Sequence, residues 1–230
     1  MQKILFDDKL NLTNLVVSGK KTQTRRQEMV LHNTMWRWRD CDPVMDEWNP
    51  EENGIHVYFS RSSRGISDMI VHPKYKKGEE VSVGMSYRNI LNVINNSNLG
   101  ITEEYYRKYA ADIYGIKSLE SQKGFGNKLF INPELMLHTL TISDVNFEQF
   151  EDISDEDAIK EGIAMFDNNS YGYTKNGEKS DKLYESPSEA FIGMLNNELN
   201  IKDMTFWCVV YDFDVHTFSL VEKIKNYVNK

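Results

Sequence analysis

The chain has 230 residues, 40% of them hydrophobic, and carries a formal net charge of −8. This composition supplies enough apolar surface for the core of one large domain and argues against global disorder. No segment approaches the roughly 18 apolar residues of a membrane span, and the N-terminus lacks the apolar stretch of a signal peptide, so we expect a cytoplasmic protein with no membrane contact.

Cysteines and histidines do not form the spacing patterns of a metal site. Cys41 and Cys208 lie far apart, and the five histidines are scattered without a His-x-x-x-His pair. We therefore expect no metal site and no other cofactor.

The first elements predicted along the chain are strands, a short helix and a hairpin. Residues 3–6 predict a strand, and the apolar spacing of 11–18 predicts a helix that ends at Gly19. The polar stretch 27–53 is expected to be irregular, whereas 55–59 and 68–71 predict a hairpin and 81–85 a strand.

The second half of the chain begins with a helical region and continues with strands and capped helices. Two helices are predicted around 90–94 and 102–114, the second of them capped by Thr102. A strand follows within 129–145, and Ser154 caps a predicted acidic helix at 155–161 that Gly162 ends. The Gly- and Asn-rich stretch 166–185 is expected to be a mobile loop. The remaining predicted elements are a helix from Ser186-Pro187 to about residue 199, a strand at 205–214 and a helix at 217–228.

The most distinctive segment is a basic run that follows Gly19. It contains four cations and two hydroxyl groups within seven residues, namely Lys20, Lys21, Thr22, Gln23, Thr24, Arg25 and Arg26. A basic segment in an acidic chain is unsuited to indiscriminate binding of polyanions, because the rest of the surface repels them. The run indicates a site for one or two phosphates or for one polar substrate, with a solvated basic loop as the alternative.

Three separated segments together resemble the ASCH family of the PUA-like superfamily. They are residues 4–26, which end in a Gly-x-Lys-Thr-x-Thr-x-Arg type run, residues 145–163, which contain the acidic segment 150–163, and residues 186–191 with the strand 206–213. Their order and spacing are similar to those of the longer members found in bacteriophages and gut bacteria. The resemblance implies an α+β fold with a PUA-like β-barrel flanked by short helices. It also implies a single domain over residues 1–230, with helical or irregular insertions at about 27–75 and 87–126.

Two departures from the family pattern weaken the expectation of phosphate binding. The strand that follows Gly78 lacks the arginine and the glutamate usual in longer relatives, and the segment 131–138 lacks two basic residues. Their loss reduces the expected affinity for long RNA more than it affects the expected fold.

The resemblance also implies a catalytic site. Small ASCH members are amidohydrolases that remove the acyl group from acetylated cytidine, and their catalytic lysine, threonine and glutamate correspond to Lys21, Thr24 and Glu161. A lysine can activate a threonine hydroxyl only when desolvation or a nearby cation lowers the lysine pKa. Lys21 and Thr24 lie three residues apart, so they need a bend to meet in an extended segment.

Other residues of the basic run and an aromatic pair are expected to bind the substrate. Aromatic faces and guanidinium planes suit unpaired bases, although packing in a core or a lid is the alternative for the two tryptophans. The predicted substrate-binding residues are Lys20, Thr22, Arg25, Arg26, Trp36 and Trp38.

The sequence predicts a protein that binds RNA or a modified nucleoside, with hydrolysis of an acylated cytidine-like amide as its expected chemistry. Whether it is an enzyme stays open, because Lys21 and Arg26 can instead form purely structural ion pairs with the seven carboxylates of residues 148–161. One alternative is a metal-independent ribonuclease, which some ASCH relatives resemble. Another is a non-catalytic phage-type module that binds a protein partner through its insertions. The sequence predicts no oligomeric state.

Overall fold

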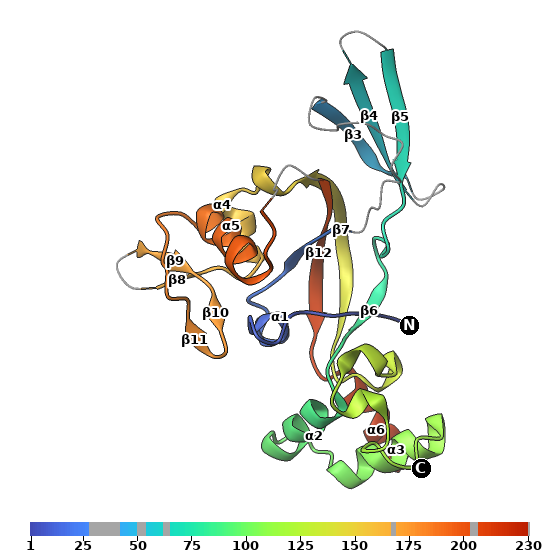
Figure 1. Ribbon diagram of the computed structural model, residues 1–230. Helices are drawn as coiled ribbons and strands as arrows, with labels where there is room; N and C mark the ends of the chain where they lie inside the picture. The colour runs from blue at the N-terminus through green and yellow to red at the C-terminus, as the bar shows by residue number, and fades with distance from the viewer. Residues whose placement is uncertain (28–41, 50–53, 62–64, 167–168, 203–206, 230) are drawn as a thin grey trace. The chain divides into compact units, whose positions relative to one another are not determined.

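The computed structural model describes residues 1–27, 42–49, 54–61, 65–166, 169–202 and 207–229 (Figure 1). Helices and strands are mixed along the chain, which confirms the predicted α+β class. Among the described helices, none combines the length and the apolar character that crossing a bilayer requires.

Five strands form the largest sheet, in the order β1-β6-β7-β12-β2. Their bounds are Gln2–Ile4 for β1, Glu80–Val83 for β6, Thr139–Gln149 for β7, Trp207–His216 for β12 and Gln23–Arg26 for β2. β1 runs parallel to β6, whereas β6 pairs antiparallel with β7 and β12 pairs antiparallel with β2. Among the strands that the structure describes, this sheet ends at β1 and β2 and does not close, so the PUA-like barrel stays a prediction.

The chain divides into two compact units. The first comprises Met1–Gly19, Glu80–Thr141 and Asp214–Lys230, and the second comprises Lys20–Glu79 and Ile142–Phe213. The predicted single domain with insertions at about 27–75 and 87–126 is not tested by this division and stays a prediction.

The first unit contains four of the predicted helices. They are α1 (Leu12–Val17), α2 (Tyr87–Asn96), α3 (Glu103–Tyr114) and α6 (Ser219–Val228), with short 3₁₀ turns at Lys123–Phe125, Lys128–Phe130 and Pro133–Leu135. The side chains of Ser86 and Thr102 accept hydrogen bonds from backbone N–H groups in the first turns of α2 and α3. Such caps satisfy donors that have no partner within a helix, so α2 and α3 begin at these residues.

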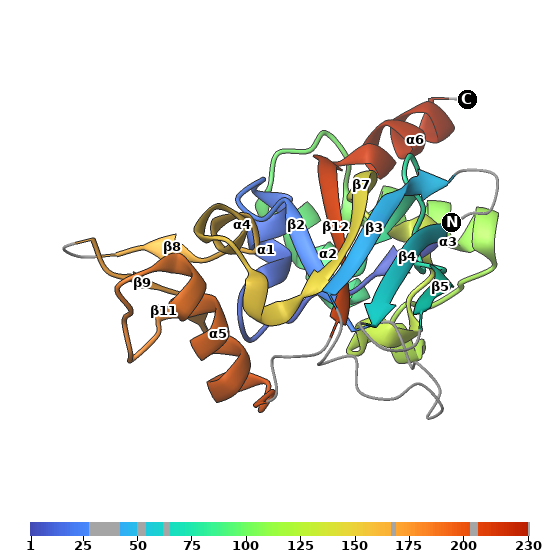
Figure 2. The same cartoon turned by 90° about the horizontal axis from the view of Figure 1, so that it is seen from above.

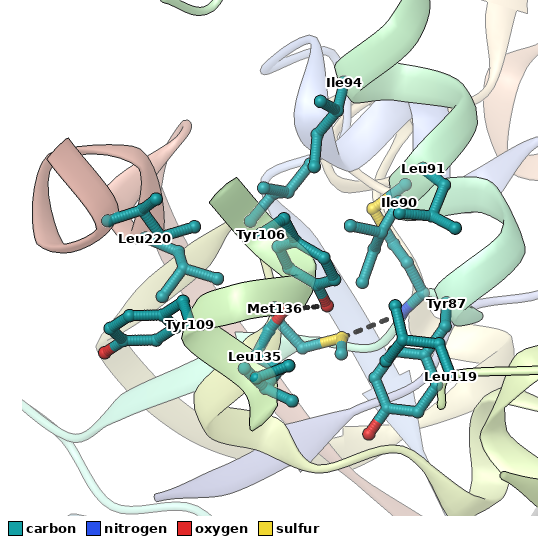
Figure 3. Close-up of a cluster of buried hydrophobic side chains, with 14 of the residues drawn as sticks. Tyr87, Ile90, Leu91, Ile94, Tyr106, Tyr109, Leu119, Leu135, Met136 and Leu220 are labelled. Carbon is teal, nitrogen blue, oxygen red and sulfur yellow. Dashed lines mark hydrogen bonds between the residues drawn. The ribbon is translucent and has the colours of Figure 1, made fainter. Parts of the chain in front are cut away.

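A hydrophobic cluster forms the core of the first unit (Figure 3). Apolar residues at a spacing of three and four on α2 lie on one face and are buried. The Tyr106 hydroxyl, although buried, donates a hydrogen bond to the Leu135 carbonyl at 3.0 Å. Members of the cluster include Tyr87, Ile90, Leu91, Ile94, Tyr106, Tyr109, Leu119, Leu135, Met136 and Leu220.

The second unit contains two capped helices, α4 (Asp155–Lys160) and α5 (Pro187–Glu198), and the 3₁₀ turn Phe150–Asp152. The Ser154 hydroxyl accepts a hydrogen bond from Asp157 N at 3.1 Å, and Ser186 caps α5 in the same way. α4 contacts both α5 and β2, and Figure 2 shows it beside β2. The helices predicted at 155–161 and at 187–199 are confirmed.

A three-stranded sheet corrects one prediction about the second unit. β3 (Asp42–Asn49) pairs antiparallel with β4 (Gly54–Arg61), which pairs with β5 (Gly65–Val71). The predicted hairpin is confirmed as β4 and β5, but the expected irregular structure of 27–53 is wrong for 42–49. The sequence signal for a strand is weak at 42–49, because Pro43 has no N–H group to donate to a neighbouring strand. Among the described strands, β3 is accordingly an edge strand, which pairs with β4 alone.

Residues 169–185 of the predicted mobile loop 166–185 are also more ordered than expected. β8 (Ala164–Met165) pairs with β9 (Tyr171–Gly172), and β10 (Thr174–Lys175) pairs with β11 (Glu178–Lys179). Asn176 and Gly177 have φ angles of 51° and 87°, the left-handed conformations of a two-residue hairpin turn. Asn176 and Gly177, which contribute to the predicted mobility, therefore form the turn between β10 and β11.

Candidate functional site

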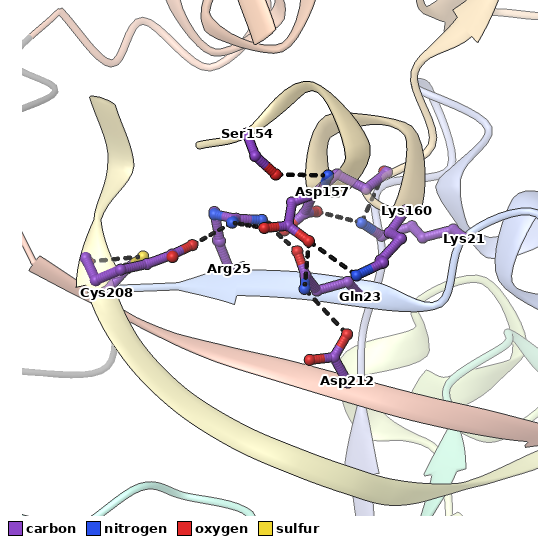
Figure 4. A network of polar contacts seen from close by, with 10 residues as sticks. Lys21, Gln23, Arg25, Ser154, Asp157, Lys160, Cys208 and Asp212 are labelled. Atoms are coloured by element: carbon purple, nitrogen blue, oxygen red, sulfur yellow. Dashed lines mark hydrogen bonds and ion pairs between the residues drawn. The ribbon is translucent and has the colours of Figure 1, made fainter. Parts of the chain in front are cut away.

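The segment that carries the basic run is held by backbone hydrogen bonds to α4 and β12. Thr22 N donates to the Lys160 carbonyl at 2.9 Å, and Phe213 N donates to the Thr22 carbonyl at 2.9 Å. The chain then continues as β2 in antiparallel register with β12. Alternate side chains of an extended segment share a face, so positions 21, 23 and 25 present their side chains on the α4 side (Figure 4).

Lys21 and Glu161 form a buried ion pair at the C-terminal end of α4. Lys21 Nζ donates to the Glu161 carbonyl oxygen at 2.8 Å and also to Glu161 Oε2. The Lys21 side chain is 2% exposed and the Glu161 side chain 4%. Both charges are therefore removed from water and depend on each other and on neighbouring polar groups for stabilisation.

Arg25 is the second buried cation of the site, with a side chain that is 0% exposed. Its Nη1 atom donates to Glu161 Oε1 at 3.3 Å, while Nη2 contacts Glu148 Oε1 and lies 3.5 Å from Asp157 Oδ2. The guanidinium carbon is 6.0 Å from the centre of the Phe191 ring on α5. Arg25 thus links β2 to β7, α4 and α5.

Gln23 connects the same network to β12. Its Oε1 atom accepts a hydrogen bond from Arg25 Nη1. Its Nε2 atom donates to Asp157 Oδ1 at 3.3 Å and to Asp212 Oδ1 at 3.0 Å. Because its partners are a donor on one side and two acceptors on the other, they fix the orientation of the amide.

Burial has the largest influence on the protonation of Lys21. Desolvation lowers the pKa of Lys21, and this outweighs the attraction of Glu161, which raises it. The positive charges of Arg26 and Arg25 lower this pKa further. Lys21 is therefore closer to the neutral amine than an exposed lysine is, and a lysine acts as a base in its neutral form.

The pKa of Arg25 depends on its burial and on the carboxylates around it. Burial lowers the pKa of Arg25, but attraction to Glu161 and Glu148 reverses this, so the net pKa is raised and the guanidinium stays charged. Burial raises the pKa of Glu148 against the attraction of Arg25, and it raises the pKa of Asp212 against the hydrogen bond from Gln23. We take Glu148 as ionised, because it contacts a buried guanidinium directly and remains 29% exposed to water.

The structure brings together some of the predicted site residues and separates others. Lys21, Glu161 and Arg25 meet, whereas alternation along β2 places the buried Thr24 side chain on the face opposite to Gln23 and Arg25. Lys20 is exposed, and Thr22 and Arg26 are half-buried. Trp36 and Trp38 lie outside the described residues.

Four polar residues of the network were not among the predicted site residues. The spacing of two between positions 21, 23 and 25 is the signal that indicates Gln23, since an extended segment presents these residues on one face. The carboxylates that contact Gln23 and Arg25 lie on elements distant in sequence, so no local sequence pattern predicts these contacts. The four residues are Gln23, Glu148, Asp157 and Asp212.

The described residues contain no group of three or more His, Cys, Asp or Glu side chains arranged to hold a metal ion. Each described carboxylate of the site instead contacts a cation or an amide. No protein-family model, curated protein or solved structure matches the chain.

Proposed function

We propose that this chain binds a modified nucleoside and hydrolyses an acyl amide on its base, as its resemblance to the ASCH family implies. The buried Lys21–Glu161 ion pair carries the proposal. A buried ion pair contributes little net stability, because desolvation offsets the attraction between its charges. Lysines whose pKa is lowered by burial are typical of catalytic sites, so the pair is better explained by chemistry than by stability.

Lys21 is the base in the proposed reaction. As a neutral amine it takes a proton from a water molecule, whose oxygen attacks the acyl carbonyl carbon. The ammonium then returns the proton to the exocyclic nitrogen as the C–N bond breaks, which yields a carboxylic acid and the free nucleoside. Glu161 stabilises the ammonium between these steps, because its Oε2 atom accepts a hydrogen bond from Nζ.

Thr24 has no part in the attacking step of this proposal. Its side chain lies on the other face of β2 from the two residues that contact the ion-pair network, so a water molecule is assigned as the source of the attacking oxygen. The variant Thr24→Val tests this assignment. Full activity is expected, whereas loss of activity would make Thr24 the nucleophile.

The charges of the site favour a nucleoside over a polynucleotide as the ligand. Lys21, Arg25 and Lys160 each contact carboxylates of the segment 148–161, which neutralises much of their charge. Binding of a nucleic-acid backbone relies on cations that can replace its counterions, and the net charge of −8 opposes it. The proposal also includes membership of the ASCH family and a PUA-like barrel, with which the α+β fold and the five-stranded sheet are compatible.

Release of cytidine from a panel of N-acylated cytidines tests the proposed function. We expect turnover by the wild type, and a loss of about 100-fold or more in kcat for Lys21→Ala and for Glu161→Gln. Lys77→Ala is the matched control, because it removes an exposed ion pair with Asp144 in the same unit, and it is expected to keep full activity. Circular dichroism verifies that each variant is folded.

The other outcomes separate the remaining functions. No turnover by folded wild type on any acyl chain would contradict the hydrolase. Cleavage of RNA, or salt-dependent retention on it, would support the ribonuclease alternative. Absence of both activities would support the interaction module.

A further inference from the structure

Arg25 contacts more elements of the second unit than the proposed chemistry requires. We propose that Arg25, held by Glu148, is a positioning residue that fixes the Glu161 carboxylate and divides its negative charge between two cations. The inference rests on the proposed function, because Lys21 is the base whose proton this arrangement controls. In the resemblance to the ASCH family, Arg25 occupies a variable position of the basic run, and Arg26 corresponds to the arginine of the motif.

The contacts of the guanidinium suit this role. Arg25 Nη1 donates to Glu161 Oε1 at 3.3 Å while Lys21 binds Oε2, so a different cation holds each oxygen of one carboxylate. On the other side, Nη2 contacts Glu148 and Asp157. A planar guanidinium with donors in fixed directions transmits orientation between its partners, which a point charge such as an ammonium does not.

Gln23 holds the guanidinium from its own strand. The amide oxygen accepts from Arg25 Nη1, and the amide nitrogen is held by Asp157 and Asp212. In the described part of the chain, Arg25 Nε is buried without a hydrogen-bond partner. The terminal nitrogens therefore determine where the guanidinium lies.

Arg25 and Glu148 act on the Lys21 proton in opposite directions. A Glu161 carboxylate that is shared with Arg25 attracts the Lys21 proton less than an unshared one. Loss of the Arg25 charge is therefore expected to raise the pKa of Lys21. Loss of the Glu148 charge strengthens the pull of Arg25 on Glu161 and is expected to lower the pKa of Lys21.

The titratable and charged groups that face this network come from every strand and helix packed against it. β7 contributes two carboxylates, the 3₁₀ turn after it one carboxylate, β12 a carboxylate and a thiol, α4 with the residue that follows it three carboxylates and an ammonium, and the basic run three cations. They are Lys21, Arg25, Arg26, Asp144, Glu148, Asp152, Glu156, Asp157, Lys160, Glu161, Cys208 and Asp212. The two substitutions proposed below change one of these charges each.

A titration of Lys21 by NMR tests the inference without a substrate. In protein labelled with carbon-13 at the lysine ε position, the Lys21 signal is assigned by its absence from Lys21→Arg. We expect the pKa of Lys21 to rise by about one unit in Arg25→Gln and to fall by about one unit in Glu148→Gln. Lys175→Gln, which removes an exposed ammonium paired with Glu198 in the same unit, is the control and is expected to leave the pKa of Lys21 unchanged.

A kinetic measurement separates the effect of the guanidinium geometry of Arg25 from the effect of its charge. Arg25→Lys keeps the positive charge but cannot hold Glu148 and Glu161 in one plane. We expect the pKa of Lys21 to stay near its wild-type value, kcat to fall about 100-fold and KM to be unchanged. A purely structural arginine would alter stability without this split between kcat and KM.

The inference would be overturned if the pKa of Lys21 did not shift in Arg25→Gln and Glu148→Gln, or if it shifted in the same direction in both. If Arg25→Gln does not fold, Glu148→Gln alone decides, because Glu148 is 29% exposed and glutamine has the same shape. Opposite shifts in a protein without turnover would refute the hydrolase and leave the role of Arg25 intact. If turnover depends on Lys21 but the two shifts of the Lys21 pKa are not opposite, the hydrolase proposal stands and the inference about Arg25 is refuted.

Discussion

At the scale of single residues, Lys21 and Glu161 form a buried ion pair in which only Glu161 has Arg25 as a second partner. Glu161→Leu leaves the Lys21 charge buried and is expected to lower the free energy of unfolding by about 3–5 kcal/mol, whereas Lys21→Met leaves Glu161 paired with Arg25 and is expected to lower it by less. The double variant replaces both charges by apolar groups of similar size and is expected to recover most of that loss. Urea unfolding of the three variants measures these differences.

The exposed pair Lys77–Asp144 supplies the reference for this experiment. Its removal is expected to change the free energy of unfolding by no more than about 1 kcal/mol, because water screens exposed charges. Single variants of Lys21 or Glu161 that cost no more than this would show that the buried pair is unimportant for the fold.

At the scale of elements, α5 contains a glycine at which helix propensity and packing oppose each other. Alanine is favoured over glycine in a helix by about 1 kcal/mol. At Gly193, however, an added Cβ would lie 2.0 Å from the hydroxyl oxygen of Tyr184. We expect packing to dominate, so that Gly193→Ala lowers the free energy of unfolding by about 1–3 kcal/mol in thermal unfolding.

Gly126→Ala is the matched control for Gly193→Ala. An added Cβ there would meet its nearest atom, in Arg88, at 4.0 Å, so we expect no loss of stability. Tyr184→Ala in the Gly193→Ala background is expected to remove the clash. If it recovers no stability, Tyr184 is not the cause of the effect.

How much of each element could be predicted depends on whether its signal is local. Ser154, Ser186 and Thr102 mark helix starts by contacts within one turn, so these helices were predictable. β3 depends on hydrogen bonds to β4, and its own residues give no comparable signal. The dipeptide Asn176-Gly177 is a local turn signal, although the Gly- and Asn-rich composition around it favours a mobile loop.

The same distinction applies to the site. Lys21, Glu161 and Arg25 could be predicted as site residues from the chemistry of the basic run and from its resemblance to the ASCH family. Gln23 and Asp212, which hydrogen-bond to each other, lie 189 residues apart, and no spacing rule connects them. The sequence likewise does not tell which of the seven carboxylates of residues 148–161 Arg25 contacts.

At the scale of the whole molecule, stability in acid is expected to depend on His138. This buried side chain accepts a hydrogen bond from the Phe218 N–H through Nδ1 at 3.3 Å, and burial lowers its pKa from 6.5 to about 4. The unfolded state therefore binds the proton first as the pH falls. Stability is complete above about pH 6.5 and decreases as the pH falls to about 4, by up to about 3 kcal/mol.

Urea unfolding at a series of pH values measures this dependence. His138→Gln is expected to flatten the profile between about pH 6.5 and 4, because glutamine does not titrate. The exposed His216 is the control, and His216→Gln is expected to leave the profile as in the wild type. An unchanged profile in His138→Gln would assign the acid sensitivity to other groups.

Among the strands that the structure describes, β2 lies at an edge of the five-stranded sheet, and this position has a consequence for self-association. An edge strand offers unpaired backbone groups to a strand of another molecule, which is a common route to aggregation. β2 directs Gln23 and Arg25 toward partners on α4, β7 and β12. In a newly synthesised chain whose α4 has not yet docked, an intruding strand would bury the guanidinium away from its carboxylates, at a large cost in desolvation. We therefore expect the buried charge of Arg25 to oppose strand addition at this edge, whatever ligand the site binds.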